Sequence, residues 1–184
     1  MSSENGFSWR YGYDIGIQDN QIIVRVEVNL VPGDGVKKIA LDRVIPGWEK
    51  EIEHIWSRKF GIQTQTGQLY PIVVDAAFKG RRFHHDVIVK PGGGCCTDQL
   101  NWHILDTPMA IAHEFGHMLG NYDEYRRGAL DPGTKIIDPT SIMTSKPKNG
   151  IAYPRHFQRV LDWFKEKNGS DNMMLLTLHQ EPSK

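Results

Sequence analysis

The chain has 184 residues, enough for one domain with a sizeable core. Hydrophobic residues make up 39% and charged residues 24%, as is ordinary for a soluble globular protein, and no apolar run approaches the length of a membrane span. Lys plus Arg and Asp plus Glu both number 22, so no net charge draws the chain towards nucleic acid or an anionic membrane.

The two ends of the chain carry no clear periodicity. Residues 1–20 are polar and predict an irregular N-terminal segment, and residues 168–184 predict a C-terminal tail of one domain that spans residues 1–184. The first residues contain neither a basic region nor an apolar run, so we expect no classical signal peptide.

Apolar and polar residues alternate over Gln21–Leu30, and this period of two predicts a half-buried strand. Turn residues occupy positions 32–35, and Lys38–Val44 could pair back as a second strand. Pro46–Gly47 then predicts the start of a helix that Gly61 ends. The apolar side of this helix, which we expect to pack against the sheet, consists of Trp48, Ile52, Ile55, Trp56 and Phe60.

Three further strands are predicted over Tyr70–Ala77, Phe83–Lys90 and Asn101–Leu105. The edge of a sheet can bind an extended substrate by backbone pairing, and we expect Phe83–Lys90 to form such an edge beside a cleft. His84 and His85 alternate faces on that strand, so a surface or substrate-lining role is favoured over a second metal site.

The next helix carries the main candidate site. Thr107 can cap it, with Pro108 at its first position. His113 and His117 lie four residues apart and project from the same face, so their ring nitrogens can converge on one metal ion. Glu114 lies on the flank of that face, where it can reach a water on the metal without being a ligand. The opposite side of the helix, which we expect to face the core, consists of Met109, Ala112, Phe115 and Leu119.

A third ligand follows the helix. Gly120 comes three residues after His117, where a left-handed residue can end the helix and reverse the chain. The reversed chain could bring the carboxylate of Asp123 to the metal. Glu124 is adjacent and could substitute if the turn is offset; otherwise we expect it to lie behind the ligands or to pair with Arg126.

Ser141–Thr144 follow a loop rich in Pro, Gly and Asp, and predict a tight turn that carries Met143 beneath the metal site. Gly116 inside the helix that carries both histidines costs about 1 kcal/mol relative to alanine, which suggests the close approach of another segment, such as this turn. Pro154–Lys167 predicts a second long helix, and Met173–Leu178 a final strand or a docked tail.

Together these residues resemble the metzincin clan of zinc endopeptidases, whose pattern is H-E-x-x-H-x-x-G-x-x-H/D followed by a methionine turn. The resemblance in sequence covers residues 113–143. It implies that His113, His117 and Asp123 are the zinc ligands, with an aspartate in third place as in snapalysin-like members. It further implies that Glu114 is the general base and that Met143 is the methionine of the turn.

The order of elements also agrees with that family. The implied fold is an α/β (α+β) metzincin-like zincin, with a twisted mixed sheet of four to five strands, an active-site helix, a backing helix and a C-terminal helix. The implied function is that of a metalloendopeptidase with a Zn²⁺ cofactor, which acts on an unfolded or extended protein or peptide segment. A zinc-activated water would attack the peptide bond, and Glu114 would pass its proton to the leaving amine.

Several roles stay open. Some family members place a tyrosine that assists the oxyanion two residues after the methionine, but Ser145 occupies that position here. Tyr125 and Tyr153 are the candidates for this role, and either could instead be a core or rim residue. His156, at the start of the final helix, could lie behind the ligands or act as a spare ligand.

Cys95 and Cys96 are the only cysteines, and adjacent cysteines rarely bridge each other without strain. They predict free thiols; the alternative is a thiolate that binds the zinc and holds the enzyme latent. The cluster of Lys79, Arg81 and Arg82 predicts a solvated surface.

Two other functions fit the same residues. A zinc hydrolase of small amides or peptidoglycan stem peptides would use identical chemistry in a closed pocket. A binding module could keep zinc without activity, although such a site has no need of the general base Glu114. The compact chain without a signal or pro-segment resembles bacterial effector or toxin domains, which stay cytoplasmic in the producer until a specialised secretion system exports them. That resemblance implies a secretion-apparatus carrier, or an inhibitor or immunity protein, as a further partner.

Overall fold

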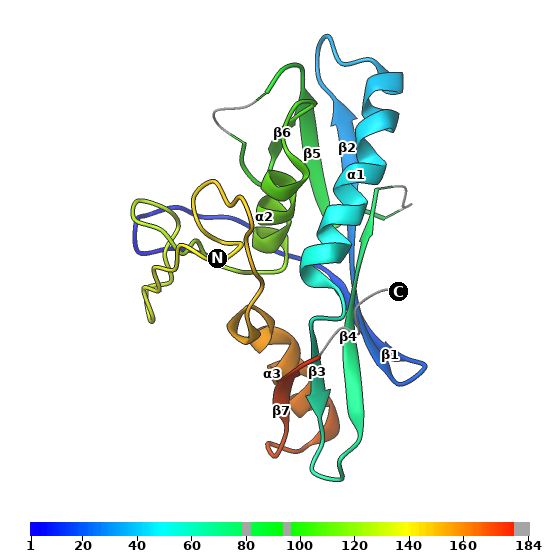
Figure 1. Cartoon of the computed structure of the whole chain (residues 1–184), viewed down its shortest axis with the longest axis vertical. Coiled ribbons are helices and arrows are strands. Elements are labelled where there is room, and N and C mark those ends of the chain that lie inside the picture. Colours follow the sequence, from blue (N-terminus) through cyan, green and yellow to red (C-terminus); the bar gives the residue numbers. More distant parts are fainter. Residues whose placement is uncertain (79–81, 94–96, 179–184) are drawn as a thin grey trace.

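The computed structural model of the protein describes residues 1–78, 82–93 and 97–178. Its centre is a seven-stranded mixed sheet in the order β6-β5-β2-β4-β3-β7, with β1 paired to β2 beside that path (Figure 1). The strands are β1 (Asp14–Gln18), β2 (Gln21–Pro32), β3 (Phe60–Gln63), β4 (Leu69–Ala77), β5 (His85–Lys90), β6 (Asn101–His103) and β7 (Met174–Thr177). The expected mixed sheet is confirmed, with more strands than the four to five predicted.

Strand β2 joins the two halves of the sheet. Its first half pairs in parallel with β4 from Ile22 to Glu27, and its second half pairs in parallel with β5 from Val28 to Pro32. Alternate side chains point into the core, as the period of two predicted. The fully buried ones are Ile22, Val24, Val26 and Val28.

Strands β1 and β2 form a hairpin that the sequence pattern does not reveal. Its two-residue loop, Asp19–Asn20, has positive φ at both positions, the conformation that matches the twist of paired strands. The expectation that residues 1–20 are irregular is therefore wrong for Asp14–Gln18. This strand is only partly buried, so its order comes from pairing with β2 and leaves little hydrophobic signal.

Helix α1 (Lys38–Trp56) begins earlier than predicted, and the strand expected over Lys38–Val44 is wrong. Its buried residues recur every three or four positions. This spacing places them on one face of a helix, whereas in a strand they would point to both faces. They are Leu41, Ile45, Trp48, Ile52, Ile55 and Trp56. Pro46, expected at the helix start, lies inside the helix at the cost of one backbone hydrogen bond. Gly61 lies in strand β3, which the sequence did not predict.

The position of β5 in the sheet also differs from the expectation. β5 was expected to form an exposed edge, but it lies between β2 and β6, and the short strand β6 is at the end of the sheet. β6 pairs only with Ile88–Lys90 of β5. The sequence left open a strand or a docked tail near the C-terminus. The structure shows a strand, β7, which pairs antiparallel with β3.

Helices α1 and α2 (Pro108–Met118) lie side by side against the sheet (Figure 1). They are joined by a buried hydrogen bond, in which Trp56 Nε1 donates to the carbonyl oxygen of Ala112 at 2.9 Å. The predicted last helix is confirmed as a 3₁₀ turn, η1 (Pro154–Phe157), followed by α3 (Gln158–Asn168). Within the described ranges, no helix has the length and apolar character needed to cross a membrane.

The N-terminal residues lie outside the sheet, beside the loops that follow α2 (Figure 1). The backbone N–H of Glu4 donates to Leu130 O at 3.0 Å, and that of Gly12 donates to Met118 O at 3.3 Å. These bonds join the start of the chain to both the end of α2 and the loop beyond it.

Candidate metal centre

The ends of α2 are fixed by local sequence. At its start, Thr107 Oγ1 accepts a hydrogen bond from the Ala110 N–H at 3.2 Å, so the predicted cap is confirmed. At its end, Gly120 has a φ of +91°, and its N–H donates to His117 O at 2.9 Å. The Asn121 N–H donates to Gly116 O at 3.0 Å. These two bonds are those of a glycine C-cap, and they reverse the chain as predicted.

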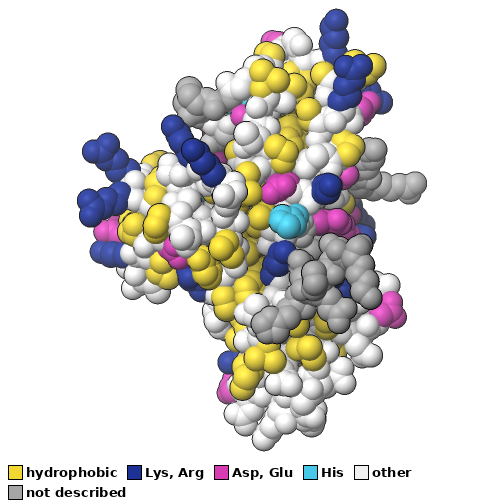
Figure 2. Space-filling model, viewed as in Figure 1, with side chains coloured by type: hydrophobic (Ala, Val, Ile, Leu, Met, Phe, Trp, Pro, Cys, Tyr) yellow, Lys and Arg dark blue, Asp and Glu magenta, His cyan; other side chains and the backbone are white. Residues whose placement is uncertain are grey.

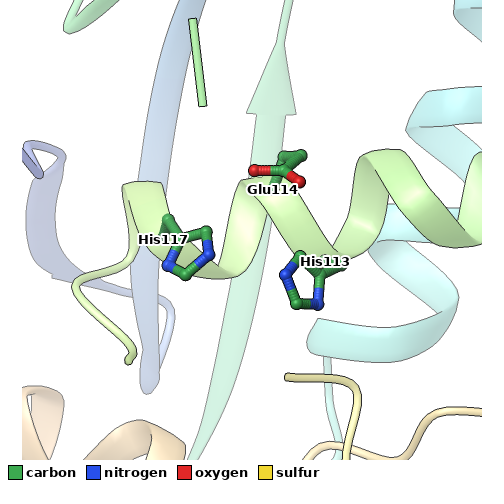
Figure 3. A group of neighbouring side chains, drawn as sticks. All are labelled: His113, Glu114 and His117. Carbon is green, nitrogen blue, oxygen red and sulfur yellow. The ribbon is translucent and has the colours of Figure 1, made fainter. Parts of the chain in front are cut away.

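Three buried side chains of α2 could hold a metal ion. The donor atoms of His113, Glu114 and His117 lie within 4.8 Å of one another. Figure 3 shows both imidazole rings on the same side of the helix, with Glu114 between them along its axis. The pentapeptide therefore forms a buried group that could hold a metal ion, in agreement with its spacing.

Backbone carbonyls orient the two rings. His113 Nδ1 lies 2.8 Å from Ile142 O, and His117 Nδ1 lies 2.9 Å from Asn121 O. A carbonyl oxygen can only accept, so each Nδ1 carries the hydrogen. In the neutral ring, each Nε2 then presents a lone pair towards the centre of the site.

Asp123 completes this arrangement from the loop after α2. Its Oδ1 atom lies 3.3 Å from His113 Nε2 and 3.4 Å from His117 Nε2. Oδ1 is buried, and no residue in the described part of the chain satisfies it with a well-directed hydrogen bond. Burial acts to raise the pKa of Asp123, but hydrogen bonds and charge from the two histidines, in the protonated form of their rings, outweigh burial and hold the pKa below its usual range. When both rings are neutral, their Nε2 lone pairs face Oδ1 instead. Three electron-pair donors thus converge at one point, where a cation would stabilise them.

The loop itself holds the Asp123 carboxylate in place. Asp123 Oδ2 accepts a hydrogen bond from the Ala129 N–H at 2.6 Å, and the Asp123 N–H donates to Ala129 O at 3.0 Å. A Cβ atom at position 128 would lie 2.6 Å from the Asp123 Cβ, so the loop closes only around Gly128.

Glu124 points to a different group of residues. Arg155 donates to both of its carboxylate oxygens at 2.7 Å, and His156 Nε2 lies 3.1 Å from Oε1. The partner is thus Arg155, and the expected pairing with Arg126 is wrong. The structure brings Asp123, and not Glu124, to His113 and His117. His156 contacts Glu124 instead.

The methionine turn lies against the middle of α2. Met143 is fully buried, and a hydrogen bond from Thr144 N to Ser141 O at 3.1 Å closes the turn. A Cβ atom on Gly116 would lie 2.4 Å from Met143 Sδ and 2.8 Å from Trp56 Cζ2. The close approach that the mid-helix glycine predicted is confirmed.

The metal-binding group opens into a cavity of about 890 Å³. His113, Glu114, His117, Asp123 and Tyr125 line it together with four other parts of the chain, three of which precede α2 in the sequence. Those three are residues 7–10, residues 84–86 and residues 97–101, so His84 and His85 border the cavity as expected. The rest of the wall comes from residues 127–129.

The two candidate tyrosines are placed differently. The Tyr125 ring lies 6.4 Å from the His113 ring, and burial, with the charges of Asp123 and Glu114, raises the pKa of its hydroxyl. Tyr125 therefore stays protonated and can donate a hydrogen bond. Tyr153 does not line the cavity; its hydroxyl lies 2.6 Å from Thr140 Oγ1 and Arg155 covers its ring.

Glu114 lies in a low-dielectric environment. Burial raises the pKa of Glu114 to about 8 and outweighs the opposing effect of His113. A carboxyl group with such a pKa can both accept and donate a proton near neutral pH, which is the property of a general acid–base group.

The contact of the N-terminal segment with this site was not predicted from the sequence. The Trp9 ring packs edge-on at 5.5 Å from the His117 ring and 5.0 Å from the Tyr122 ring. Phe7 and Arg10 line the cavity beside it. The available signal was the presence of four aromatic residues in this largely polar segment, which are Phe7, Trp9, Tyr11 and Tyr13.

Cys95 and Cys96 lie outside the described residues, as do Lys79 and Arg81 of the basic cluster. The predictions of free thiols or of a zinc-bound thiolate therefore stay predictions.

Comparisons of the chain with protein-family models, with curated proteins and with solved structures gave no match. The function is therefore argued from the site itself.

Replacement of Gly116 by alanine tests the packing of the methionine turn. A helix gains about 1 kcal/mol from such a change, but overpacking costs about 1–3 kcal/mol. We expect Gly116→Ala to lower the free energy of unfolding by about 1–2 kcal/mol in urea. Gly47→Ala in α1 is the control, because its Cβ would meet only Pro108 Cγ at 4.0 Å. Equal gains from both substitutions would contradict the close contact.

The Glu124–Arg155 pair predicts an acid-dependent loss of stability. Burial acts to raise the pKa of Glu124, but hydrogen bonds from Arg155 and His156 outweigh it and lower the pKa from 4.5 to about 2. Because the folded-state pKa is the lower one, the pair stabilises the fold above about pH 4.5, and this contribution is lost as the pH falls towards 2.

Urea unfolding of the metal-free protein at several pH values measures this contribution. We expect Glu124→Gln to cost about 2–3 kcal/mol at pH 7 and much less at pH 3. Glu53→Gln, at an exposed position of α1, should leave the unfolding curve nearly unchanged. A deficit in Glu124→Gln that is constant across this range would show that the charge of Glu124 is not what stabilises the fold.

Proposed function

We propose that the chain is a zinc-dependent metalloendopeptidase of the metzincin type, with zinc held by His113, His117 and Asp123. The observation that carries this proposal is the convergence of three electron-pair donors beside Glu114, at the wall of an open cavity. The glycine C-cap that delivers Asp123 and the methionine turn packed on Gly116 support the same family.

The separations of the donor atoms fit zinc. Ligand atoms about 2.0–2.1 Å from a tetrahedral zinc ion are about 3.3–3.4 Å apart. The Asp123 Oδ1 atom lies 3.3 and 3.4 Å from the two Nε2 atoms. Two imidazoles and one carboxylate also leave a fourth position free, which is typical of catalytic zinc sites and not of structural ones.

Zinc bound there would supply Lewis acidity, which lowers the pKa of water and polarises a peptide carbonyl. Glu114 accepts the proton that the attacking water loses and delivers it to the amine that leaves. The buried environment of Glu114 favours this return of the proton, because it raises the pKa of the carboxyl group to about 8. Tyr125 is the candidate donor to the developing oxyanion, since its protonated hydroxyl borders the same cavity.

The size and walls of the cavity favour a polypeptide substrate over a small amide. A volume of about 890 Å³ lies at the upper end of the usual range for ligand sites. Two of its lining residues, Phe7 and Leu100, are 52% and 56% exposed and offer apolar contacts at its mouth. An open cavity of this kind can accept several residues of an extended chain, whereas a small amide would be better enclosed.

The general base is tested by Glu114→Gln. Glutamine has the same shape and no charge, so we expect the fold and one equivalent of bound zinc to be retained. Hydrolysis of a denatured protein substrate should fall by at least about 100-fold. Metal analysis and the appearance of new peptide termini measure the two effects, and wild-type activity in this variant would refute the mechanism.

The ligand set is tested by metal analysis after dialysis. We expect His113→Ala, His117→Ala and Asp123→Asn each to lose the bound zinc. His54→Ala, at an exposed position on α1, and Glu124→Gln should each retain one equivalent. Loss of zinc from Glu124→Gln with retention in Asp123→Asn would reverse the assignment of the third ligand.

A further inference from the structure

Two free arginine side chains border the cavity beside the metal centre. Arg10 comes from the N-terminal segment and Arg127 from the loop that begins with Asp123, and both are exposed. Neither guanidinium group hydrogen-bonds or forms an ion pair with any residue that the structure describes. Figure 2 shows Lys and Arg side chains gathered over the loops around the N-terminus, at the left of the molecule.

The carboxylates of the same cavity outside the metal centre are already hydrogen-bonded. Asp98 Oδ1 accepts from the N–H groups of Leu100 and Asn101 at 2.8 and 2.9 Å. Asp86 Oδ1 accepts from Asn29 Nδ2 at 2.8 Å. An anionic group that enters the cavity therefore meets free cations, while the fixed anions there are partly satisfied by their neighbours.

The backbone at Arg127 adopts a conformation that favours glycine. Its φ is +72°, and the Gly128 N–H donates to Tyr125 O at 3.2 Å. Arg127 is thus the third residue of a four-residue turn, a position where glycine or asparagine usually supplies a positive φ.

This strained position is distinctive within the described ranges. The other non-glycine residues with positive φ do not line the cavity; they are Asp19, Asn20, Arg58, Lys135 and Lys146. Arg127 is thus the one non-glycine residue with positive φ, among those described, that lines the cavity, and this position motivates a functional role for its side chain.

We propose that Arg127, assisted by Arg10, binds a substrate carboxylate and makes the protein selective for extended protein segments with an acidic residue near the scissile bond. The guanidinium group matches a carboxylate with two parallel hydrogen bonds. Arg127 and Asp123 line the same cavity, so a carboxylate bound by Arg127 would belong to a substrate that also reaches the candidate metal site. This inference rests on the peptidase function proposed above.

The test compares kcat/KM for two quenched fluorescent peptides that differ only in one Glu, replaced by Gln, beside the cleaved bond. We expect the wild-type protein to prefer the Glu peptide by about tenfold. Arg127→Gln should lose most of this preference. Arg126→Gln, which removes an exposed arginine that does not line the cavity, should keep it.

A second variant separates recognition from folding. Arg127→Gly removes the guanidinium group and also relieves the strained φ. We expect Tm to rise by about 2–4 °C while the preference for Glu is lost. Peptides with free and amidated C-termini distinguish the two sources of a carboxylate. A preference that follows the free terminus and not the Glu side chain would overturn selection of an acidic residue.

The inference and the proposed function fail in different ways. If all variants hydrolyse peptides with the same Glu to Gln ratio as the wild type, the role of Arg127 is wrong and the peptidase function stands. If no peptide is hydrolysed, the peptidase function is wrong. Fluorescence anisotropy with the same peptide pair then tests the role of Arg127 through binding alone. Tighter binding of the Glu peptide that is lost in Arg127→Gln but kept in Arg126→Gln supports this role. Equal binding of the two peptides by the wild-type protein refutes it.

Discussion

The candidate site depends on one constraint, which is that the lone pairs of two imidazole nitrogens and one carboxylate oxygen point at the same position. The Nδ1 atoms of His113 and His117 are committed to backbone carbonyls, so both Nε2 atoms face Asp123 Oδ1 without a hydrogen between them in the neutral rings. Such a cluster in a buried position is repulsive by itself and becomes favourable around a cation. The protein builds the cluster with ordinary backbone devices, which are a glycine C-cap and two carbonyl acceptors.

The same constraint explains why segments far apart in the sequence meet behind the site. The methionine turn supplies the carbonyl that orients His113, and it packs on Gly116 between the two histidines. Glu124, next to Asp123, is held by Arg155 and His156 at the start of the last helix. A buried ion pair of this kind adds little net stability compared with an apolar contact, but it allows one register of the loop and not others. Its position beside Asp123, the proposed third ligand, fits that role.

Local and non-local features differ in how well the sequence predicted them. The helix caps, the C-cap at Gly120 and the contact at Gly116 follow from rules that act within a few residues, and these predictions are confirmed. The strand predicted over Lys38–Val44 was wrong because Leu41 belongs to a helical stripe that continues past Pro46. Arg155 as partner of Glu124 could not be found, because nothing local links positions 31 residues apart.

The loop that begins with Asp123 joins the candidate metal site to the wall of the cavity. Asp123 is held by Ala129, and Arg127 between them lines the cavity. The N-terminal segment, which brings Arg10 and Trp9 to the other wall, is bonded to the same loop through Glu4 and Leu130. A change that moves either wall therefore also moves the loop that holds the Asp123 carboxylate. For this reason the strain at Arg127 has to stay small and local, since a larger distortion of this short loop would displace the Asp123 carboxylate from the two histidines.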